Sequence, residues 1–171
     1  MTQFRVRIEK DYTVFCAGHF ITYDGHECEA LHGHNYQAAA ALEGPLDANA
    51  YVFDFTRLKR ALKAVVDRLD HRMLLPTQSA LIQVVQSGAE VQATYRDKRY
   101  VFPLSDVVLL PVPNTTAEML AWWIAQELKQ GVGTLPPGAT AIEVEVDESS
   151  GQRAFYREAL GEGGPAEPGR P

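Results

Sequence analysis

The segment CEALHGHNY at residues 28–36 concentrates side chains that bind metals and carry protons. Residues two apart on a strand point to the same face, so His32 and His34 would present two imidazoles side by side. His19 closely follows the first expected strand, and a hairpin would bring it alongside them. Three neutral histidines would hold zinc and leave its fourth tetrahedral position open, which is the arrangement of a catalytic site. An H-x-H pair alone does not establish such a site, because histidines often satisfy local hydrogen bonds instead.

Two further groups near these histidines could move protons. Cys28 lies four positions before His32 in a polar loop, where a nearby cation would acidify its thiol as a catalytic cysteine requires. The alternative is a half-buried small hydrophobe, which is what we expect of Cys16 within VFCAG. Asp70 beside His71, at the end of an expected helix, could form an acid–histidine relay. The alternative there is a histidine that complements the helix dipole.

Glu148 lies next to the end of the segment EVEVDES, in which Val144 and Val146 alternate with polar residues. The alternation places Glu148 on the apolar face at the end of a strand. A carboxylate in that position costs free energy unless it is paired or meets a ligand. It is suited to accept two parallel N–H groups, such as those on the edge of an aminopyrimidinone ring.

The hydrophobic periodicity predicts two helices and at least four strands around these residues. One helix follows the N-cap Asp54, and a second follows Thr115 or Thr116 and closes at Gly131. The expected strands cover residues 4–16, 33–43, 140–149 and 153–158, and a β meander of four short strands occupies residues 80–110. The order ββα, meander, αββ indicates an α+β domain and not a parallel βαβ series.

The composition suits a single globular domain of 171 residues with a net charge of −6. That charge argues against a nucleic-acid partner, and the sequence has no apolar stretch suited to a membrane partner. The N-terminal MTQFRVRIEK has no signal-peptide pattern, and two cysteines suggest reduced thiols, so we expect a cytoplasmic protein. We expect one domain over residues 1–160, with an insertion at about 78–112, and a disordered tail over residues 161–171.

Several motifs in order resemble the 6-pyruvoyltetrahydropterin synthase and 6-carboxytetrahydropterin synthase family. The resemblance covers most of residues 4–158 apart from the meander. It implies the tunnelling fold, a four-stranded antiparallel sheet with two helices on one face. It also implies a homo-oligomer, usually a hexamer of two stacked trimers, with active sites between subunits. The motifs are AGH at 17–19, CEALHGHNY at 28–36, VFDFTRLK at 52–59, LDH at 69–71, NTTAEMLAWWI at 114–124 and VDES at 146–149.

The same resemblance implies roles for the residues already singled out. The substrate would be 7,8-dihydroneopterin triphosphate, and a zinc ion would polarise its side-chain hydroxyls. Cys28 would be the general base, and Asp70 with His71 would tune the thiol and relay protons. Glu148 would anchor the pterin edge, and Thr115 or Thr116 would help to seat the ring. The zinc ligands would be His19, His32 and His34.

The resemblance leaves the product open between two branches. Cys28 at its spacing before H-G-H is similar to the 6-carboxytetrahydropterin synthases, which feed queuosine synthesis. Glu29 at its own spacing is similar to the folate-branch members, which give 6-hydroxymethyl-7,8-dihydropterin; otherwise it is an exposed loop acid. We expect a zinc-dependent lyase making 6-carboxytetrahydropterin. The alternatives are 6-pyruvoyltetrahydropterin synthesis, a folate-branch or mixed activity, and a non-catalytic pterin-binding protein. Asp147 and the long meander depart from the family's pattern.

Overall fold

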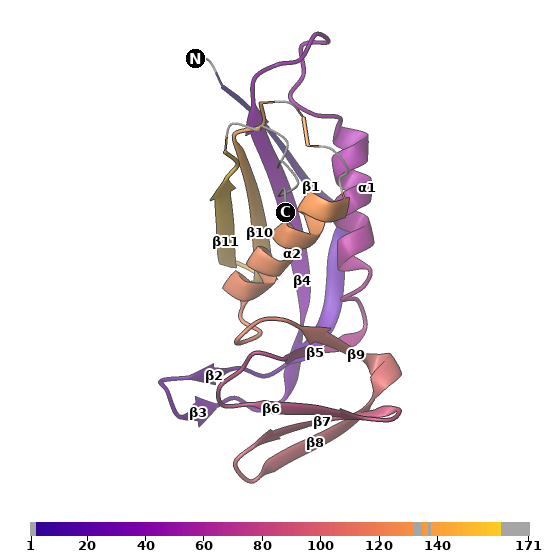
Figure 1. The fold of residues 1–171 in the computed structure, drawn as a ribbon, viewed down its shortest axis with the longest axis vertical. Coiled ribbons are helices and arrows are strands. Elements are labelled where there is room, and N and C mark those ends of the chain that lie inside the picture. Colours follow the sequence, from indigo (N-terminus) through magenta and orange to yellow (C-terminus); the bar gives the residue numbers. More distant parts are fainter. Residues whose placement is uncertain (1–2, 132–134, 137, 162–171) are drawn as a thin grey trace, which may run out of the picture.

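The protein, described here by a computed structural model, consists of one large sheet, two helices on one face of it, and a small sheet at one end (Figure 1). The structure describes residues 3–131, 135–136 and 138–161, so the expected tail falls almost wholly outside them. The strands of the large sheet, in spatial order, are β11 (Gln152–Ala159), β10 (Ala141–Ser149), β4 (His32–Gly44), β1 (Phe4–His19), β5 (Arg72–Pro76) and β9 (Val107–Leu110).

Four of these strands, β11, β10, β4 and β1, form the expected antiparallel sheet. β5 and β9, which extend the sheet beyond β1, run parallel to it. The sequence analysis placed the segment of β9 in the meander, and this was wrong. Its unbroken apolar run, VVLL, is typical of a parallel strand. The pairing of Val107 with Met73 draws it into the large sheet.

The register between β1 and β4 sets which side chains share a face at the end of the sheet. His19 lies opposite His32, Ala17 opposite His34, and Phe15 opposite Tyr36. β1 therefore includes His19 as its last residue, whereas the predicted strand stopped at residue 16. In β1 the residues Phe15, Ala17 and His19 are buried, so this face is the one that the helices cover.

Helix α1 (Phe55–Val66) begins where Asp54 accepts a hydrogen bond from the backbone N–H of Thr56. Its apolar face packs into the main core. Helix α2 (Ala117–Gly131) is capped by Thr116, whose hydroxyl accepts from the N–H of Met119 at 3.4 Å. α1 ends earlier than the sequence suggested, so residues 67–71 form a turn that leads into β5. Neither helix is long and apolar enough to cross a membrane, a finding that covers only the described part of the chain.

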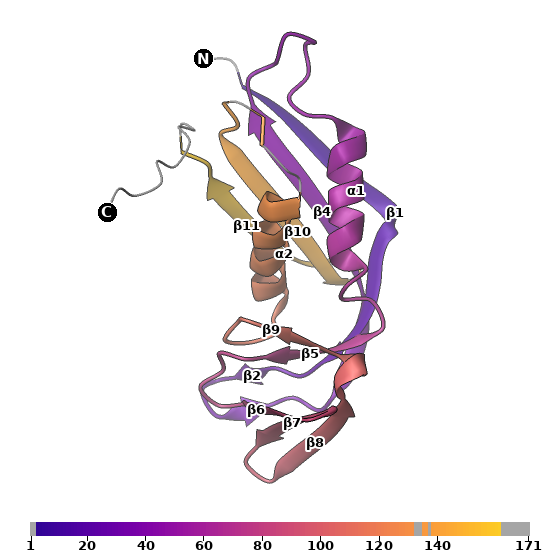
Figure 2. The ribbon, with the colours of Figure 1, turned by 45° about the vertical axis from the view of Figure 1, so that its right-hand side comes forward.

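The inserted segment forms a separate three-stranded antiparallel sheet below the end of the large sheet (Figure 2). Its strands are β6 (Gln83–Ser87), β7 (Glu90–Tyr95) and β8 (Lys98–Pro103), and a single 3₁₀ turn, η1 (Leu104–Asp106), leads on to β9. A second apolar cluster joins this small sheet to Phe20, Met73 and Leu75. A two-stranded ribbon of β2 (Thr22–Tyr23) and β3 (Glu27–Cys28) lies between β1 and β4 in the sequence.

We predict that Leu62→Ala lowers the free energy of unfolding by about 2–5 kcal/mol, because it removes a fully buried side chain from the core and leaves a cavity. Arg60→Ala is the control, because Arg60 is exposed on the same helix; its expected change is below about 0.5 kcal/mol. Urea denaturation at matched protein concentration measures both. Equal losses for the two variants would contradict the packing of α1.

Candidate functional site

The three predicted histidines converge at the end of the large sheet. The nitrogen atoms that His19, His32 and His34 offer all lie within 4.8 Å of one another. Their ring centroids are 4.7 Å apart for His19 and His32 and 4.8 Å apart for His32 and His34. The sheet register produces this arrangement, since the strand end of β1 meets the strand start of β4 on one face.

Backbone carbonyls orient two of the three rings. Nδ1 of His19 lies 2.9 Å from the carbonyl oxygen of Thr115, and Nδ1 of His32 lies 2.8 Å from that of Ala30. Each Nδ1–H therefore donates, and each Nε2 keeps a lone pair for a ligand. Burial lowers the pKa of His19, which favours the neutral form that binds metal. The donor set thus fits a divalent transition ion such as zinc.

Tyr36 and Glu148 complete the cluster on the helix side of the sheet. The Tyr36 hydroxyl donates to Oε1 of Glu148 at 3.2 Å and lies 3.0 Å from Nε2 of His19. Oε1 of Glu148 is 3.3 Å from Nε2 of His19 and 3.7 Å from Nε2 of His34. Burial, together with the Glu148 charge, raises the pKa of Tyr36, so Tyr36 stays a phenol and a hydrogen-bond donor.

Sequence reasoning placed Glu148 on this face but missed Tyr36. The signal was present, because Tyr36 continues the alternation of His32 and His34 along β4. Its ring stacks on Phe15 with centroids 4.9 Å apart, so the apolar part of the side chain belongs to the core while its hydroxyl belongs to the site.

A pocket of about 540 Å³ opens beside Glu148 at the start of α2. Thr116, which caps α2, lines this pocket, whereas Thr115 is fully buried and acts through its carbonyl on His19. The two candidate threonines therefore lie in different positions. The other residues that line the pocket are Ile21, Ala117, Glu118, Gly151, Gln152, Arg153 and Ala154.

The side chains of Cys28 and Glu29 have different surroundings. Oε2 of Glu29 lies 3.8 Å from Nε2 of His32, at the edge of the histidine cluster. Cys28 packs against the second apolar cluster, which includes side chains of the small sheet. Burial raises the pKa of the Cys28 thiol, and the Glu29 charge raises it further, while Lys98 offsets only part of the increase. The expected acidification of this thiol is therefore wrong for the chain on its own.

Asp70 and His71 form an ion pair, Nδ1 to Oδ2 at 3.0 Å, on the turn before β5. Asp70 also accepts from the backbone N–H of Cys16 at 2.8 Å, and that bond first, then His71, holds the pKa of its carboxyl below the ordinary value. His71 is 80% exposed. No hydrogen bond or ion pair within the described residues joins this pair to Cys28 or to the histidine cluster. His26 is likewise exposed; its Nε2 lies 3.2 Å from Oε1 of Glu27, and its Nδ1 lies 2.7 Å from the carbonyl oxygen of Asp24.

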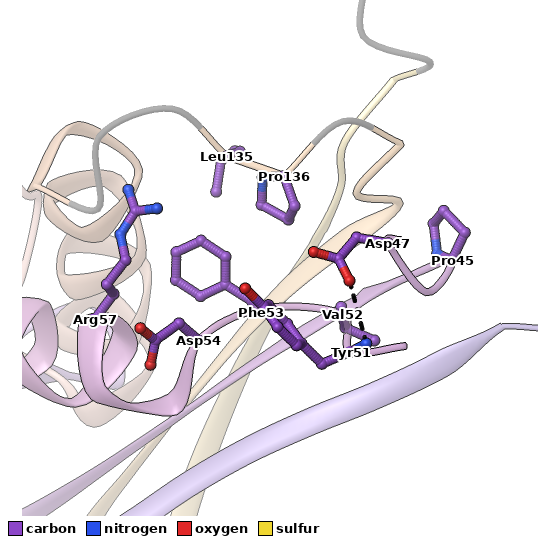
Figure 3. A pocket seen from close by; sticks show the side chains of 9 residues that line it. All are labelled: Pro45, Asp47, Tyr51, Val52, Phe53, Asp54, Arg57, Leu135 and Pro136. Carbon is purple, nitrogen blue, oxygen red and sulfur yellow. Dashed lines mark hydrogen bonds between the residues drawn. The ribbon is translucent and has the colours of Figure 1, made fainter. Parts of the chain in front are cut away.

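A second pocket, of about 620 Å³, lies between the end of β4 and the start of α1 (Figure 3). It contains none of the predicted site residues. Its two carboxylates serve local structure, since Asp54 caps α1 and Asp47 accepts backbone N–H groups of Asn49 and Tyr51. We therefore place the candidate active site at the histidine cluster.

Comparisons with known proteins identify a family that this chain resembles along most of its length. The family profile of 6-pyruvoyl tetrahydropterin synthase matches residues 7–159. A candidate 6-carboxy-5,6,7,8-tetrahydropterin synthase of Methanocaldococcus jannaschii is 34% identical over 149 residues, 85% of this chain and 90% of that protein. A dihydroneopterin monophosphate aldolase of Pyrococcus furiosus is 40% identical over 60 residues, 35% of this chain and 50% of that protein.

Among solved structures, a 6-pyruvoyltetrahydropterin synthase of Plasmodium vivax has a TM-score of 0.86 at 28% identity, covering 94% of this chain and 100% of that chain. That structure is of a mutant in which a glutamate, described as a catalytic residue, is replaced by alanine.

We predict that His34→Ala weakens zinc binding by more than about 100-fold, because the loss of an outer-shell partner alone costs about 10–100-fold. Metal content after dialysis against a weak chelator, measured by mass spectrometry, tests this. His26→Ala is the matched control, because His26 is exposed and lies outside the cluster. Wild-type zinc retention in His34→Ala would rule out the three-histidine site.

Proposed function

Since the chain belongs to the 6-pyruvoyl tetrahydropterin synthase family and is a lyase of the 6-carboxytetrahydropterin synthase type, we propose that it is zinc-dependent. We further propose that it converts 7,8-dihydroneopterin triphosphate to 6-carboxy-5,6,7,8-tetrahydropterin, a step in queuosine-type synthesis. The observation that carries the proposal is the convergence of three imidazoles, one carboxylate and a pocket at one end of the sheet.

His19, His32 and His34 would hold the metal through nitrogen atoms. A bound zinc ion would act as a Lewis acid on hydroxyls of the substrate side chain. The protein's own contribution is the orientation of the rings. The carbonyls of Thr115 and Ala30 fix the tautomers of two histidines, so their Nε2 atoms need no reorganisation on binding.

Glu148 and the adjoining pocket would bind the pterin ring. A carboxylate accepts two parallel N–H groups in a bidentate manner, which matches the amino and ring N–H edge of a pterin. Tyr36 supports this role, since its hydroxyl donates to Oε1 of Glu148 and occupies only one lone pair of that oxygen, so both carboxylate oxygens can still accept from the ligand. Thr116 lies on the same pocket and offers a hydroxyl at the start of α2.

For the 6-carboxy product, Cys28 would be the general base, and Asp70 with His71 would relay protons to it. Within one chain this pair lies apart from Cys28, and the exposure of His71 leaves it free to face a neighbouring subunit. We therefore propose a homo-oligomer, a hexamer of two trimers, in which the site is completed between subunits. An active site closed by a second subunit would also exclude water.

A second candidate activity is release of the side chain to give 6-hydroxymethyl-7,8-dihydropterin with Glu29 as the base. The specific observation in its favour is that the Glu29 carboxylate lies at the histidine cluster, whereas Cys28 packs against apolar side chains. The Pyrococcus furiosus relative is an aldolase, and the Plasmodium vivax structure is of a protein with a catalytic glutamate. The first name is in line with release of the side chain, and the second with a carboxylate base.

We predict that zinc-loaded protein, incubated with the triphosphate substrate, forms each of the two products with a different base. Cys28→Ala should abolish the 6-carboxy product, and Glu29→Ala should lower the 6-hydroxymethyl product by about 100-fold or more, because general-base groups contribute about 10²–10⁴-fold. Product masses and rates give the answer. Full 6-carboxy formation by Cys28→Ala would remove Cys28 as its base, and unchanged 6-hydroxymethyl formation by Glu29→Ala would exclude the second activity.

We also predict that Glu148→Gln weakens binding of an oxidised, unreactive pterin by about 10–100-fold, because hydrogen bonds to a charged group contribute about 1.5–3 kcal/mol. Calorimetric titration of the zinc-loaded protein measures the affinity, and metal content is checked in parallel. Glu118→Gln is the matched control, since Glu118 lines the same pocket and is exposed. Equal affinity for the two variants would argue against Glu148 as the anchor.

A further inference from the structure

The inserted small sheet holds the segment that carries Cys28 and Glu29. Lys98 Nζ donates to the carbonyl oxygen of Cys28 at 2.8 Å and to that of Glu29 at 2.9 Å. Tyr95, directly opposite Lys98 in the β7–β8 hairpin, donates its hydroxyl to the carbonyl oxygen of His26. Two residues of one hairpin thus donate hydrogen bonds to three carbonyl oxygens of a segment about 70 positions earlier in the sequence.

These contacts define the backbone on both sides of Glu29. The carbonyl of Cys28 belongs to the peptide group before Glu29, and the carbonyl of Glu29 belongs to the peptide group after it. Both point to one ammonium group, so the two peptide planes that flank the α-carbon are fixed. The N–H of Glu29 donates to the carbonyl of Ile21 at 3.0 Å, which holds the segment from the other side.

A fixed α-carbon fixes the direction in which its side chain leaves. In this arrangement the Glu29 carboxylate reaches His32, while the half-buried Cys28 side chain packs against the second apolar cluster. The small sheet therefore contacts the segment in two ways. Its hairpin binds the backbone, and its apolar side chains belong to the cluster against which Cys28 packs.

We propose that Lys98 is a positioning residue that holds Glu29 toward the metal site and Cys28 away from it, so that the inserted sheet selects between the two bases. The consequence for product choice rests on the function proposed above, but the positioning itself does not. A lysine suits this task because its ammonium carries three donors and can bind two carbonyls at once. Removing the ammonium would let the segment rotate and would leave two carbonyls without their donor.

The experiment compares Lys98→Met, Lys98→Arg and Arg99→Met with the wild type, all loaded with zinc. Methionine keeps the apolar stem of lysine, and arginine keeps a donor that can reach carbonyls. Arg99→Met is the matched control, because Arg99 is the adjacent residue of β8 and binds Gln92 on the exposed side of the small sheet. Three quantities are measured: the ratio of the two pterin products, metal content, and alkylation of Cys28 relative to Cys16 by peptide mass spectrometry.

For Lys98→Met we expect 6-hydroxymethyl formation to fall by about 10–100-fold, because a displacement of about 1 Å can cost about 100-fold in rate. The ratio of 6-carboxy to 6-hydroxymethyl product should rise, and Cys28 should alkylate faster while Cys16 does not. Lys98→Arg should restore most of the wild-type ratio, and Arg99→Met should match the wild type. A merely structural role would not move the product ratio.

The proposal is overturned if Lys98→Met and Arg99→Met give the same product ratio and the same Cys28 alkylation. It is also overturned if Lys98→Met loses its metal, because Lys98 would then support the ligands and not the bases. Tyr95→Phe gives a second, milder test, with a smaller change in the same direction expected from the loss of one hydrogen bond. If the wild type makes neither pterin, the proposed function fails, whereas alkylation of Cys28 still tests the positioning.

Discussion

The site depends first on the antiparallel pairing of β1 with β4. That pairing sets His19 opposite His32 and puts His34 on the same face two residues further along. Gly33, between the two histidines, permits the close approach of the strands. A Cβ added there would lie 3.0 Å from the carbonyl oxygen of Ala17, a backbone atom that cannot move without disturbing β1. The convergence of the three histidines thus rests on the backbone pairing of two strands.

The residues just before α2 contact the same histidine cluster. Thr115 lies just before the helix, and its carbonyl accepts from Nδ1 of His19, while Asn114 donates to the carbonyl of Thr22 at 2.8 Å. A buried imidazole without a partner would cost free energy, so the bond to Thr115 allows His19 to be 1% exposed and still correctly oriented. The pocket beside Glu148 then begins where Thr116 caps the helix. One turn of chain therefore both orients His19 and lines the pocket beside Glu148.

The sequence predicted the parts of this site that follow from short-range periodicity. Alternation along one strand placed His32 with His34, and Glu148 on the apolar face of another. It could not predict that Val107 leaves the meander to pair with Met73, because parallel pairing joins segments distant in sequence. The apolar surroundings of Cys28 could not be predicted from the sequence either, because they include side chains of the insertion, which packs through a second apolar cluster. Contacts of this kind are determined by tertiary packing, and the local sequence pattern does not predict them.

Two adjacent residues with acid–base side chains raise a problem that a single catalytic base does not. Neighbouring side chains in extended chain leave toward opposite sides, so Cys28 and Glu29 cannot both face the histidines while the backbone stays as it is. A protein that used Cys28 and Glu29 in turn as bases would need the segment that carries them to rotate. A protein that used only one of them would need the segment to be held in one orientation. The backbone of Glu29 is bound at its N–H by Ile21 and at its carbonyl by Lys98, on opposite sides of the segment. These bonds favour a held segment, and under the proposal made for Lys98 the inserted small sheet would control which base acts.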